Sequence, residues 1–252
     1  MSICRVVRGF ALATALVPLI IGCGGGDGNS APAAASPPAT AAAPKEQRHG
    51  DSAVVLFLGT SLTAGLGVDP DDAYPARVQA KIDSAGIPFR VVNAGSSGET
   101  SAGALRRLDW LLRQPFDVLV LETGANDMLR GSDPDSTRAN LEAIIRRVRA
   151  ARPGTQIVLV GMMALPNLGR EYGAKFQAIY PDLARKYQLP LIPFLLEKVA
   201  GKPSLNLPDG MHPNETGHRL VAQTVWAGLE PILRARVAAR GGGTPAPRPG
   251  RL

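Results

Sequence analysis

The feature that most constrains the fold is a repeated switch between two hydrophobic periods along residues 51–239. Short, continuously apolar runs, of which residues 53–58 are the first, alternate with longer segments of helical spacing. Continuous apolar runs are typical of strands buried on both faces, and their connections fit helical crossovers. The sequence therefore predicts an α/β domain of flavodoxin-like type, with three α/β/α layers around a five-stranded parallel sheet.

The expected elements alternate strictly along the chain. Strands are predicted at 53–58, 89–93, 117–122, 156–161 and 189–194, and helices at 74–85, 101–114, 134–152, 170–187 and 214–239. Asp133 is expected to cap the third helix, just before Pro134. Polar, glycine-containing segments follow the strands, at 59–61, 95–100 and 124–127, and a further one occupies 209–213. Because sites in parallel sheets form at the carboxyl ends of the strands, these segments should converge on one edge.

The first 22 residues have the pattern of a signal peptide. Arg5 and Arg8 precede an apolar run, residues 9–21, that is too short to span a bilayer core of about 30 Å. The run ends in Ile20-Ile21-Gly22-Cys23, which resembles the bacterial lipobox, although leucine is usual where Ile20 stands. We therefore expect residues 1–22 to be removed and Cys23 to be lipidated. The alternative is an ordinary cleaved signal peptide that happens to contain Cys23.

Both ends of the chain flank one predicted domain at 51–239. Residues 23–50 are nearly all Gly, Ala, Pro and Ser, which predicts a flexible linker, and residues 240–252 predict a disordered tail. Together with the lipobox, the linker predicts a lipoprotein on the periplasmic face of a cell-envelope membrane. Without lipidation of Cys23, the protein would be secreted or periplasmic.

Composition excludes several classes of function. The formal net charge is +7, but the basic residues are scattered and only 5% of residues are aromatic, so nucleic-acid binding is not expected. Both cysteines, Cys4 and Cys23, precede the predicted domain, which therefore has no disulfide and no thiolate metal site. We expect no metal and no cofactor, and a monomer.

A serine follows the first predicted strand, and the sequence offers few bases to activate it. Ser61 lies in a Gly-x-Ser triplet, which by itself is more typical of a strand-to-helix turn with a serine cap. Of the three histidines, His49 lies in the linker and His218 lies inside the last helix, as a surface or packing residue. His212 remains, in a polar loop three residues after Asp209, whose carboxylate could accept the imidazole Nδ1–H.

Two further segments could supply donors for a developing oxyanion. Backbone amides near Gly98 can approach a ligand closely, because glycine has no Cβ. Asn126 follows the third predicted strand and can present a side-chain amide at the same sheet edge. Asn126 alone is more typical of a turn, so the prediction depends on the convergence of both segments with Ser61.

Four segments, in this order, resemble the SGNH (GDSL-like) hydrolase family. They are residues 59–63, 93–101, 122–127 and 209–214, and the similarity is greatest to the bacterial thioesterase I, lysophospholipase and arylesterase branch. The resemblance implies that Ser61 is the nucleophile, that Asp209 and His212 complete a triad, and that the Ser61 amide, Gly98 and Asn126 form the oxyanion hole. Thr60 stands where the family usually has Asp, which leaves open how the nucleophile turn is braced.

The resemblance implies a serine hydrolase that cleaves carboxylic ester or thioester bonds through an acyl-enzyme on Ser61. Small acyl esters, acyl thioesters and lysophospholipids are the expected substrates, and the membrane is contacted through the lipid anchor. Two alternatives remain open. One is a carbohydrate O-deacetylase, and the other is a non-catalytic lipoprotein that binds acyl chains or a cell-wall polymer.

Overall fold

The structure is a computed structural model that describes residues 52–241. The predicted signal peptide at 1–22, the linker at 23–50 with Cys23, and residues 242–252 of the predicted tail lie outside the described residues. None of the helices within residues 52–241 is long and apolar enough to cross a membrane.

A five-stranded parallel sheet forms the centre of the domain, in the order β2-β1-β3-β4-β5. Its strands are β1 (Ala53–Gly59), β2 (Phe89–Gly95), β3 (Val118–Glu122), β4 (Gln156–Val160) and β5 (Leu191–Ile192). Every residue of β1 and β3 is buried, as expected for strands with helices on both faces. This strand order is the flavodoxin-like one, so the predicted fold is confirmed.

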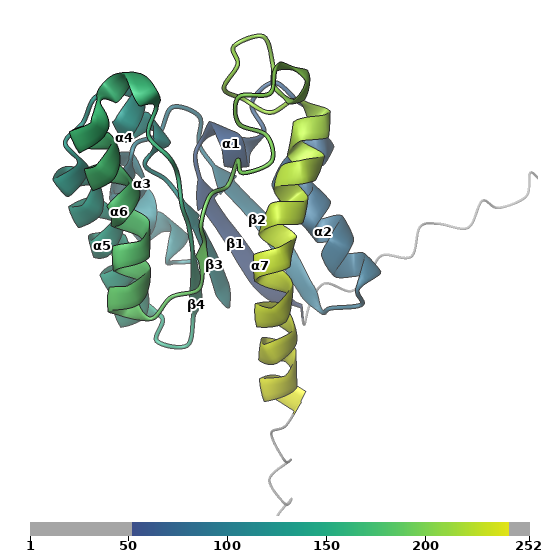
Figure 1. Cartoon of the computed structure of the whole chain (residues 1–252). Helices are drawn as coiled ribbons and strands as arrows, with labels where there is room; N and C mark the ends of the chain where they lie inside the picture. Colours follow the sequence, from purple (N-terminus) through teal and green to yellow (C-terminus); the bar gives the residue numbers. More distant parts are fainter. Residues whose placement is uncertain (1–51, 242–252) are drawn as a thin grey trace, which may run out of the picture. The chain divides into compact units, whose positions relative to one another are not determined.

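Helices cover both faces of this sheet (Figure 1). The long ones are α2 (Tyr74–Ser84), α3 (Ser101–Leu111), α5 (Pro134–Ala151), α6 (Arg170–Tyr187) and α7 (Glu215–Gly241). α2 packs against α7 on one face, and α3, α5 and α6 pack side by side on the other. The crossover from β1 to β2 runs across the sheet in the opposite direction to the later crossovers. Since crossovers are right-handed, α2 must lie on the face opposite α3, α5 and α6.

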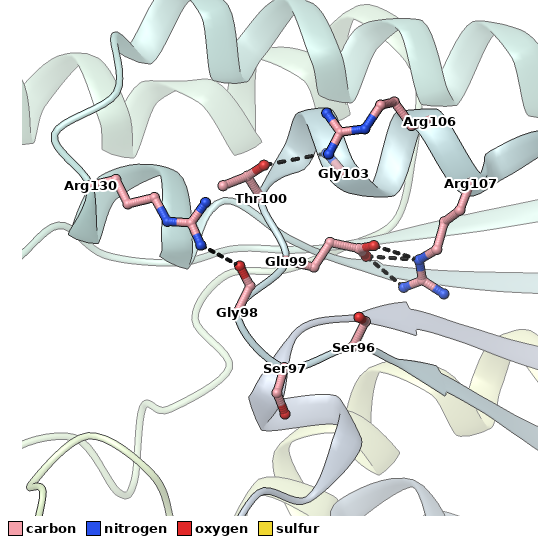
Figure 2. A pocket seen from close by; sticks show the side chains of 9 residues that line it. All are labelled: Ser96, Ser97, Gly98, Glu99, Thr100, Gly103, Arg106, Arg107 and Arg130. Atoms are coloured by element: carbon pink, nitrogen blue, oxygen red, sulfur yellow. Dashed lines mark hydrogen bonds and ion pairs between the residues drawn. The ribbon is translucent and has the colours of Figure 1, made fainter. Parts of the chain in front are cut away.

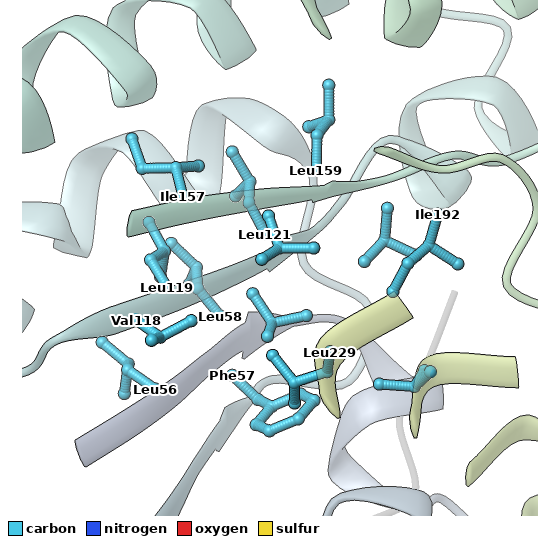
Figure 3. Packing of buried hydrophobic residues seen from close by; sticks show 14 of the residues in the cluster. Leu56, Phe57, Leu58, Val118, Leu119, Leu121, Ile157, Leu159, Ile192 and Leu229 are labelled. Atoms are coloured by element: carbon cyan, nitrogen blue, oxygen red, sulfur yellow. The ribbon is translucent and has the colours of Figure 1, made fainter. Parts of the chain in front are cut away.

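Aliphatic side chains from both faces of the sheet form the core (Figure 3). Leu56, Leu58 and Leu119 of the central strands are buried, and Leu229 of α7 is fully buried with them. Full burial of one such side chain stabilises the fold by about 1.5–3 kcal/mol. This core fixes the strands rigidly and so fixes the positions of the loops at their carboxyl ends.

The predicted helix cap is present at the start of α5. The Asp133 carboxylate accepts hydrogen bonds from the backbone N–H groups of Asp135 and Ser136. These bonds satisfy two of the N–H groups that have no partner within a first helical turn, and Pro134 has no N–H to satisfy.

Several predicted elements differ from the structure by two residues or more at one end. β2 continues to Gly95, two residues beyond the prediction, and α3 ends at Leu111, three residues before the predicted end. β5 contains only Leu191–Ile192, instead of 189–194, because Pro190 and Pro193 flank it and proline lacks the N–H that a ladder requires. α7 continues to Gly241, two residues into the segment predicted as a tail. Arg240 holds this last turn, since it pairs with Asp117 and its guanidinium lies 5.7 Å from the centre of the Phe89 ring.

Candidate active site

Ser61 lies at the carboxyl edge of the sheet, directly after β1. Thr60 is extended and acts as the N-cap of a short helix, α1 (Ser61–Ala64), which the sequence analysis did not foresee. The Ala64 N–H donates to the Thr60 carbonyl at 2.9 Å, which closes the turn immediately behind the serine. Ser61 is buried, with 8% of its surface exposed.

This turn packs so closely on its neighbours that two glycines are required. A Cβ on Gly59 would lie 2.0 Å from the Thr63 hydroxyl oxygen. A Cβ on Gly95, at the end of β2, would lie 2.2 Å from the Ala64 backbone nitrogen. Both distances are far below contact, so the position of Ser61 depends on the absence of side chains at 59 and 95.

The loop before α7 brings His212 to Ser61. Gly210 has φ +70°, the left-handed conformation that favours glycine, and turns the chain back on itself. The backbone N–H groups of Met211 and His212 donate to Asp209 Oδ1 at 2.9 and 3.0 Å. The His212 ring then lies with Nδ1 2.6 Å from Asp209 Oδ2 and Nε2 2.9 Å from Ser61 Oγ.

These contacts define the charge on Asp209. Hydrogen bonds from the His212 and Met211 amides, followed by the bond from the His212 ring, lower the pKa of the Asp209 carboxyl to about 2. Asp209 is therefore ionised at neutral pH and accepts a hydrogen bond from the Nδ1–H of the imidazole. Nε2 is then left unprotonated and faces the Ser61 hydroxyl, which is the arrangement that a general base needs.

Gly98 and Asn126 lie beside Ser61, and each is held in place by its own segment of the chain. Gly98 has φ +75° in the loop between β2 and α3. Asn126 is in α4 (Ala125–Leu129), a second short helix that was not foreseen, and its side-chain amide donates to the Glu99 carbonyl at 2.9 Å. Ser61, Gly98, Asn126 and His212 all line one cavity.

That cavity has a volume of about 700 Å³ and is mostly apolar. Among its lining residues are Leu66, Leu129, Met163, Leu165 and Met211, each of which is at least 40% exposed. Of the described residues, only one other large hydrophobic side chain, Trp110, is as exposed. Exposed apolar side chains that gather at one place mark a binding surface for an apolar ligand.

The Glu122 carboxylate stabilises the nucleophile turn, in which Thr60 replaces the usual Asp. This carboxyl ends β3 and is buried, 1% exposed, with no Lys or Arg within 4.0 Å among residues 52–241. Its Oε2 accepts the Thr60 N–H and the Thr63 hydroxyl, both at 2.8 Å, and its Oε1 lies 3.0 Å from Thr60 Oγ1. The Tyr74 hydroxyl lies 2.7 Å from Thr63 Oγ1 and extends the network.

Burial raises the pKa of Glu122 to about 7, although the bonds from Thr60 and Thr63 oppose the shift. Sequence reasoning missed this role, yet a signal was present. A buried parallel strand is expected to be apolar, and residues 118–122 read Val-Leu-Val-Leu-Glu. A carboxyl at the active-site end of such a strand needs hydrogen-bond donors, and the nucleophile turn supplies them.

Asp127 is a second carboxyl that sequence reasoning did not single out for a role. It is buried and accepts the Ser101 N–H at 2.7 Å and the Ser101 hydroxyl at 2.6 Å. Because Asn126 and Asp127 are adjacent on α4, this anchor holds α4 against the start of α3. His218, predicted to be a surface or packing residue, is buried and packs beside Tyr74, and its Nδ1 accepts the Tyr74 N–H at 3.1 Å.

The chain is similar to known proteins in both sequence and structure. Residues 57–220 match the model of the GDSL-like Lipase/Acylhydrolase family. The chain is 37% identical over 180 residues to Esterase TesA of Pseudomonas aeruginosa, covering 71% of this chain and 89% of that protein. It is 40% identical over 181 residues to Thioesterase 1/protease 1/lysophospholipase L1 of Escherichia coli K12, covering 71% and 84%. The crystal structure of AlinE4, an SGNH-hydrolase family esterase, matches with a TM-score of 0.61 and 39% identity, covering 78% of this chain and 99% of that one.

Proposed function

This chain belongs to the GDSL-like lipase/acylhydrolase family and is a serine hydrolase that cleaves carboxylic esters, and we propose that its preferred substrates carry medium-length acyl chains. The observation that carries the proposal is the apolar cavity of about 700 Å³ beside Ser61 and His212. Its size lies within the range of pockets that enclose a small ligand, and an acetyl group would leave most of it unfilled.

We propose that Ser61, His212 and Asp209 act as a catalytic triad. His212 Nε2 takes the Ser61 proton while Oγ attacks the acyl carbonyl, and Asp209 stabilises the imidazolium that forms. The tetrahedral oxyanion is bound by the Ser61 and Gly98 amides and by the Asn126 side chain. His212 then gives its proton to the departing alcohol or thiol. In the second half-reaction, a water molecule, deprotonated by His212, attacks the acyl-enzyme. The bond to Ser61 Oγ breaks, His212 returns the proton to Oγ, and the acid is released.

An ester and thioester series with acyl chains from two to twelve carbons tests this proposal. Each buried methylene contributes about 0.8 kcal/mol, so kcat/KM should rise about fourfold per methylene until the cavity is filled. Ser61→Ala should lower kcat by at least about 10⁴-fold. Ser84→Ala, an exposed serine on α2, is the matched control and should retain full activity.

The same series separates the alternatives. A sharp preference for acetate would contradict the acyl-chain proposal and favour a carbohydrate O-deacetylase. Full hydrolysis by Ser61→Ala would refute the triad assignment, and no hydrolysis by the wild type would leave a binding lipoprotein. The apolar cavity and the 2.9 Å contact between Ser61 and His212 favour the hydrolase.

We further propose that the protein is a lipoprotein, held at the periplasmic face of a cell-envelope membrane through Cys23. The support is the sequence of residues 1–23, with its basic start, apolar run and terminal cysteine. Cys23→Ser should move the protein from the membrane fraction to the soluble periplasmic fraction. A wild-type protein that is already soluble would contradict this proposal. Light scattering on the purified domain tests the expected monomer.

A further inference from the structure

A second cavity flanks the loop that carries Gly98 (Figure 2). It has a volume of about 440 Å³ and is lined by residues 96–100, Gly103, Arg106, Arg107 and Arg130. In contrast to the apolar cavity, its wall is built from hydroxyl groups, backbone, three arginines and the Glu99 carboxylate. Gly98 lines both cavities, so the two meet at the loop beside Ser61.

The arginines leave this cavity with a positive charge. Arg107 is neutralised, because its Nε and Nη2 donate to the two Glu99 carboxylate oxygens at 2.7 and 2.6 Å. Arg106 and Arg130 have no carboxylate within 4.0 Å among the described residues. Three arginines against one glutamate leave two positive charges in excess at the cavity wall.

The cavity also presents the donors that a phosphate group requires. Arg130 uses one N–H to bond the Gly98 carbonyl at 2.8 Å, and its guanidinium carries five such donors. Arg106 is exposed, and its guanidinium makes no hydrogen bond within residues 52–241, nor do the hydroxyls of Ser96 and Ser97. A planar guanidinium fork matches phosphate oxygens, which form short, charge-assisted hydrogen bonds with arginine.

We propose that this cavity, with Arg106 as its principal unpaired cation, binds the phosphate group on the leaving alcohol or thiol of the substrate. The proposal rests on the esterase function above, because it places the acyl chain in the apolar cavity and the phosphate across the loop that bears Gly98. Such substrates are glycerophosphate esters or thioesters of a phosphate-bearing thiol, which share the same anionic chemistry.

The experiment uses two matched pairs of octanoyl substrates, each below its critical micelle concentration. The first pair is octanoyl-lysophosphatidylglycerol and monooctanoylglycerol, and the second is octanoyl-coenzyme A and octanoyl-pantetheine. For each pair, the ratio of kcat/KM for the phosphate-bearing substrate to that for the neutral one is measured in wild type, Arg106→Ser and Arg113→Ser. Arg113 is an exposed arginine just beyond α3 that lines neither cavity, so it controls for net charge.

Arg106→Ser should lower the ratio about tenfold for at least one pair, and the pair that responds identifies the phosphate source. Arg113→Ser should leave both ratios unchanged. Inorganic phosphate should inhibit the wild type competitively and inhibit Arg106→Ser at least fivefold more weakly. Unchanged ratios in Arg106→Ser, or an equal fall in Arg113→Ser, would overturn the phosphate site. Hydrolysis of the neutral esters by Ser61→Ala would instead refute the esterase mechanism.

Discussion

Replacing Glu122 by Gln should make the stability of the protein depend less on pH. Gln has nearly the same shape as a protonated Glu. Its carbonyl oxygen can accept the Thr60 N–H and the Thr63 hydroxyl, as Oε2 does now, and its amide can donate to Thr60 Oγ1. The variant therefore keeps the brace of the nucleophile turn but cannot ionise.

The magnitude follows from the pKa of the buried carboxyl. Burial raises the pKa of Glu122 from its ordinary 4.5 to about 7. Between these values the folded state binds a proton that the unfolded state has released, so the stability of the wild type falls as pH rises. At about 1.4 kcal/mol per pH unit, the loss amounts to about 3 kcal/mol. The variant does not lose this stability.

Urea unfolding at pH 5 and pH 8 measures the effect. From pH 5 to pH 8, the free energy of unfolding of the wild type should fall by up to about 3 kcal/mol more than that of Glu122→Gln. Glu122→Ala is the disruptive comparison, because it leaves the Thr60 N–H and the Thr63 hydroxyl without an acceptor, at about 1–3 kcal/mol each. It should be less stable than Glu122→Gln at both pH values.

Catalysis gives a second measurement, which separates positioning of Ser61 from general stability. Below the unfolding transition, Glu122→Ala should lower kcat by at least tenfold with little change in KM, since the nucleophile is displaced while the cavity remains. Glu122→Gln should restore kcat to within about threefold of the wild type. If the free energy of unfolding changed with pH in the same way for the wild type and Glu122→Gln, the raised pKa of Glu122 would be refuted. A Glu122→Gln enzyme as slow as Glu122→Ala would refute the positioning role.

Three further outcomes are expected. Gly95→Ala should lower the free energy of unfolding by more than about 2 kcal/mol in urea titrations, because its Cβ would lie 2.2 Å from the Ala64 backbone nitrogen. Gly154→Ala, where a Cβ meets nothing within 4 Å, is its control. Asp209→Asn should retain the circular dichroism spectrum and lower kcat by about 10³–10⁴-fold, through loss of the imidazole tautomer. Burial lowers the pKa of His218 to about 4, so the wild type should lose stability from about pH 6.5 to 4, and His218→Gln should lose less.

The fold could be predicted because strands that are buried on both faces of a sheet appear in the sequence as continuous apolar runs. The apolar runs at β1 and β3 and the helical spacing of α6 gave the elements almost to the residue. β5 is shorter than its hydrophobic pattern predicts, because Pro190 and Pro193 lack the N–H groups that a longer ladder requires. The short helices α1 and α4 were missed, because one turn of helix is too short to show a period.

The catalytic residues are easier to predict from the sequence than the residues that position them, because only a few residue types can carry out the reaction. A serine needs a base, and few histidines were available, so His212 could be proposed from the sequence. Glu122 could not be assigned in the same way. It contacts Thr60, 62 residues away, only because β1 and β3 are neighbours in the sheet and end at the same edge. Such a contact depends on register and distance, which a hydrophobic pattern does not specify.

The loop that bears Gly98 is held in place by hydrogen bonds and separates the two cavities that we propose determine substrate selectivity. Its carbonyl groups are held from both sides, since Arg130 bonds the Gly98 carbonyl and Asn126 bonds the Glu99 carbonyl. Arg107 fixes the Glu99 side chain as well. A loop held at so many points has little freedom to adapt to different substrates, which favours a preorganised oxyanion site. Selectivity must then come from the side chains that line the two cavities on either side of it. Arg106, unpaired in the basic cavity, is therefore the side chain whose replacement should alter substrate choice without disturbing the reaction centre.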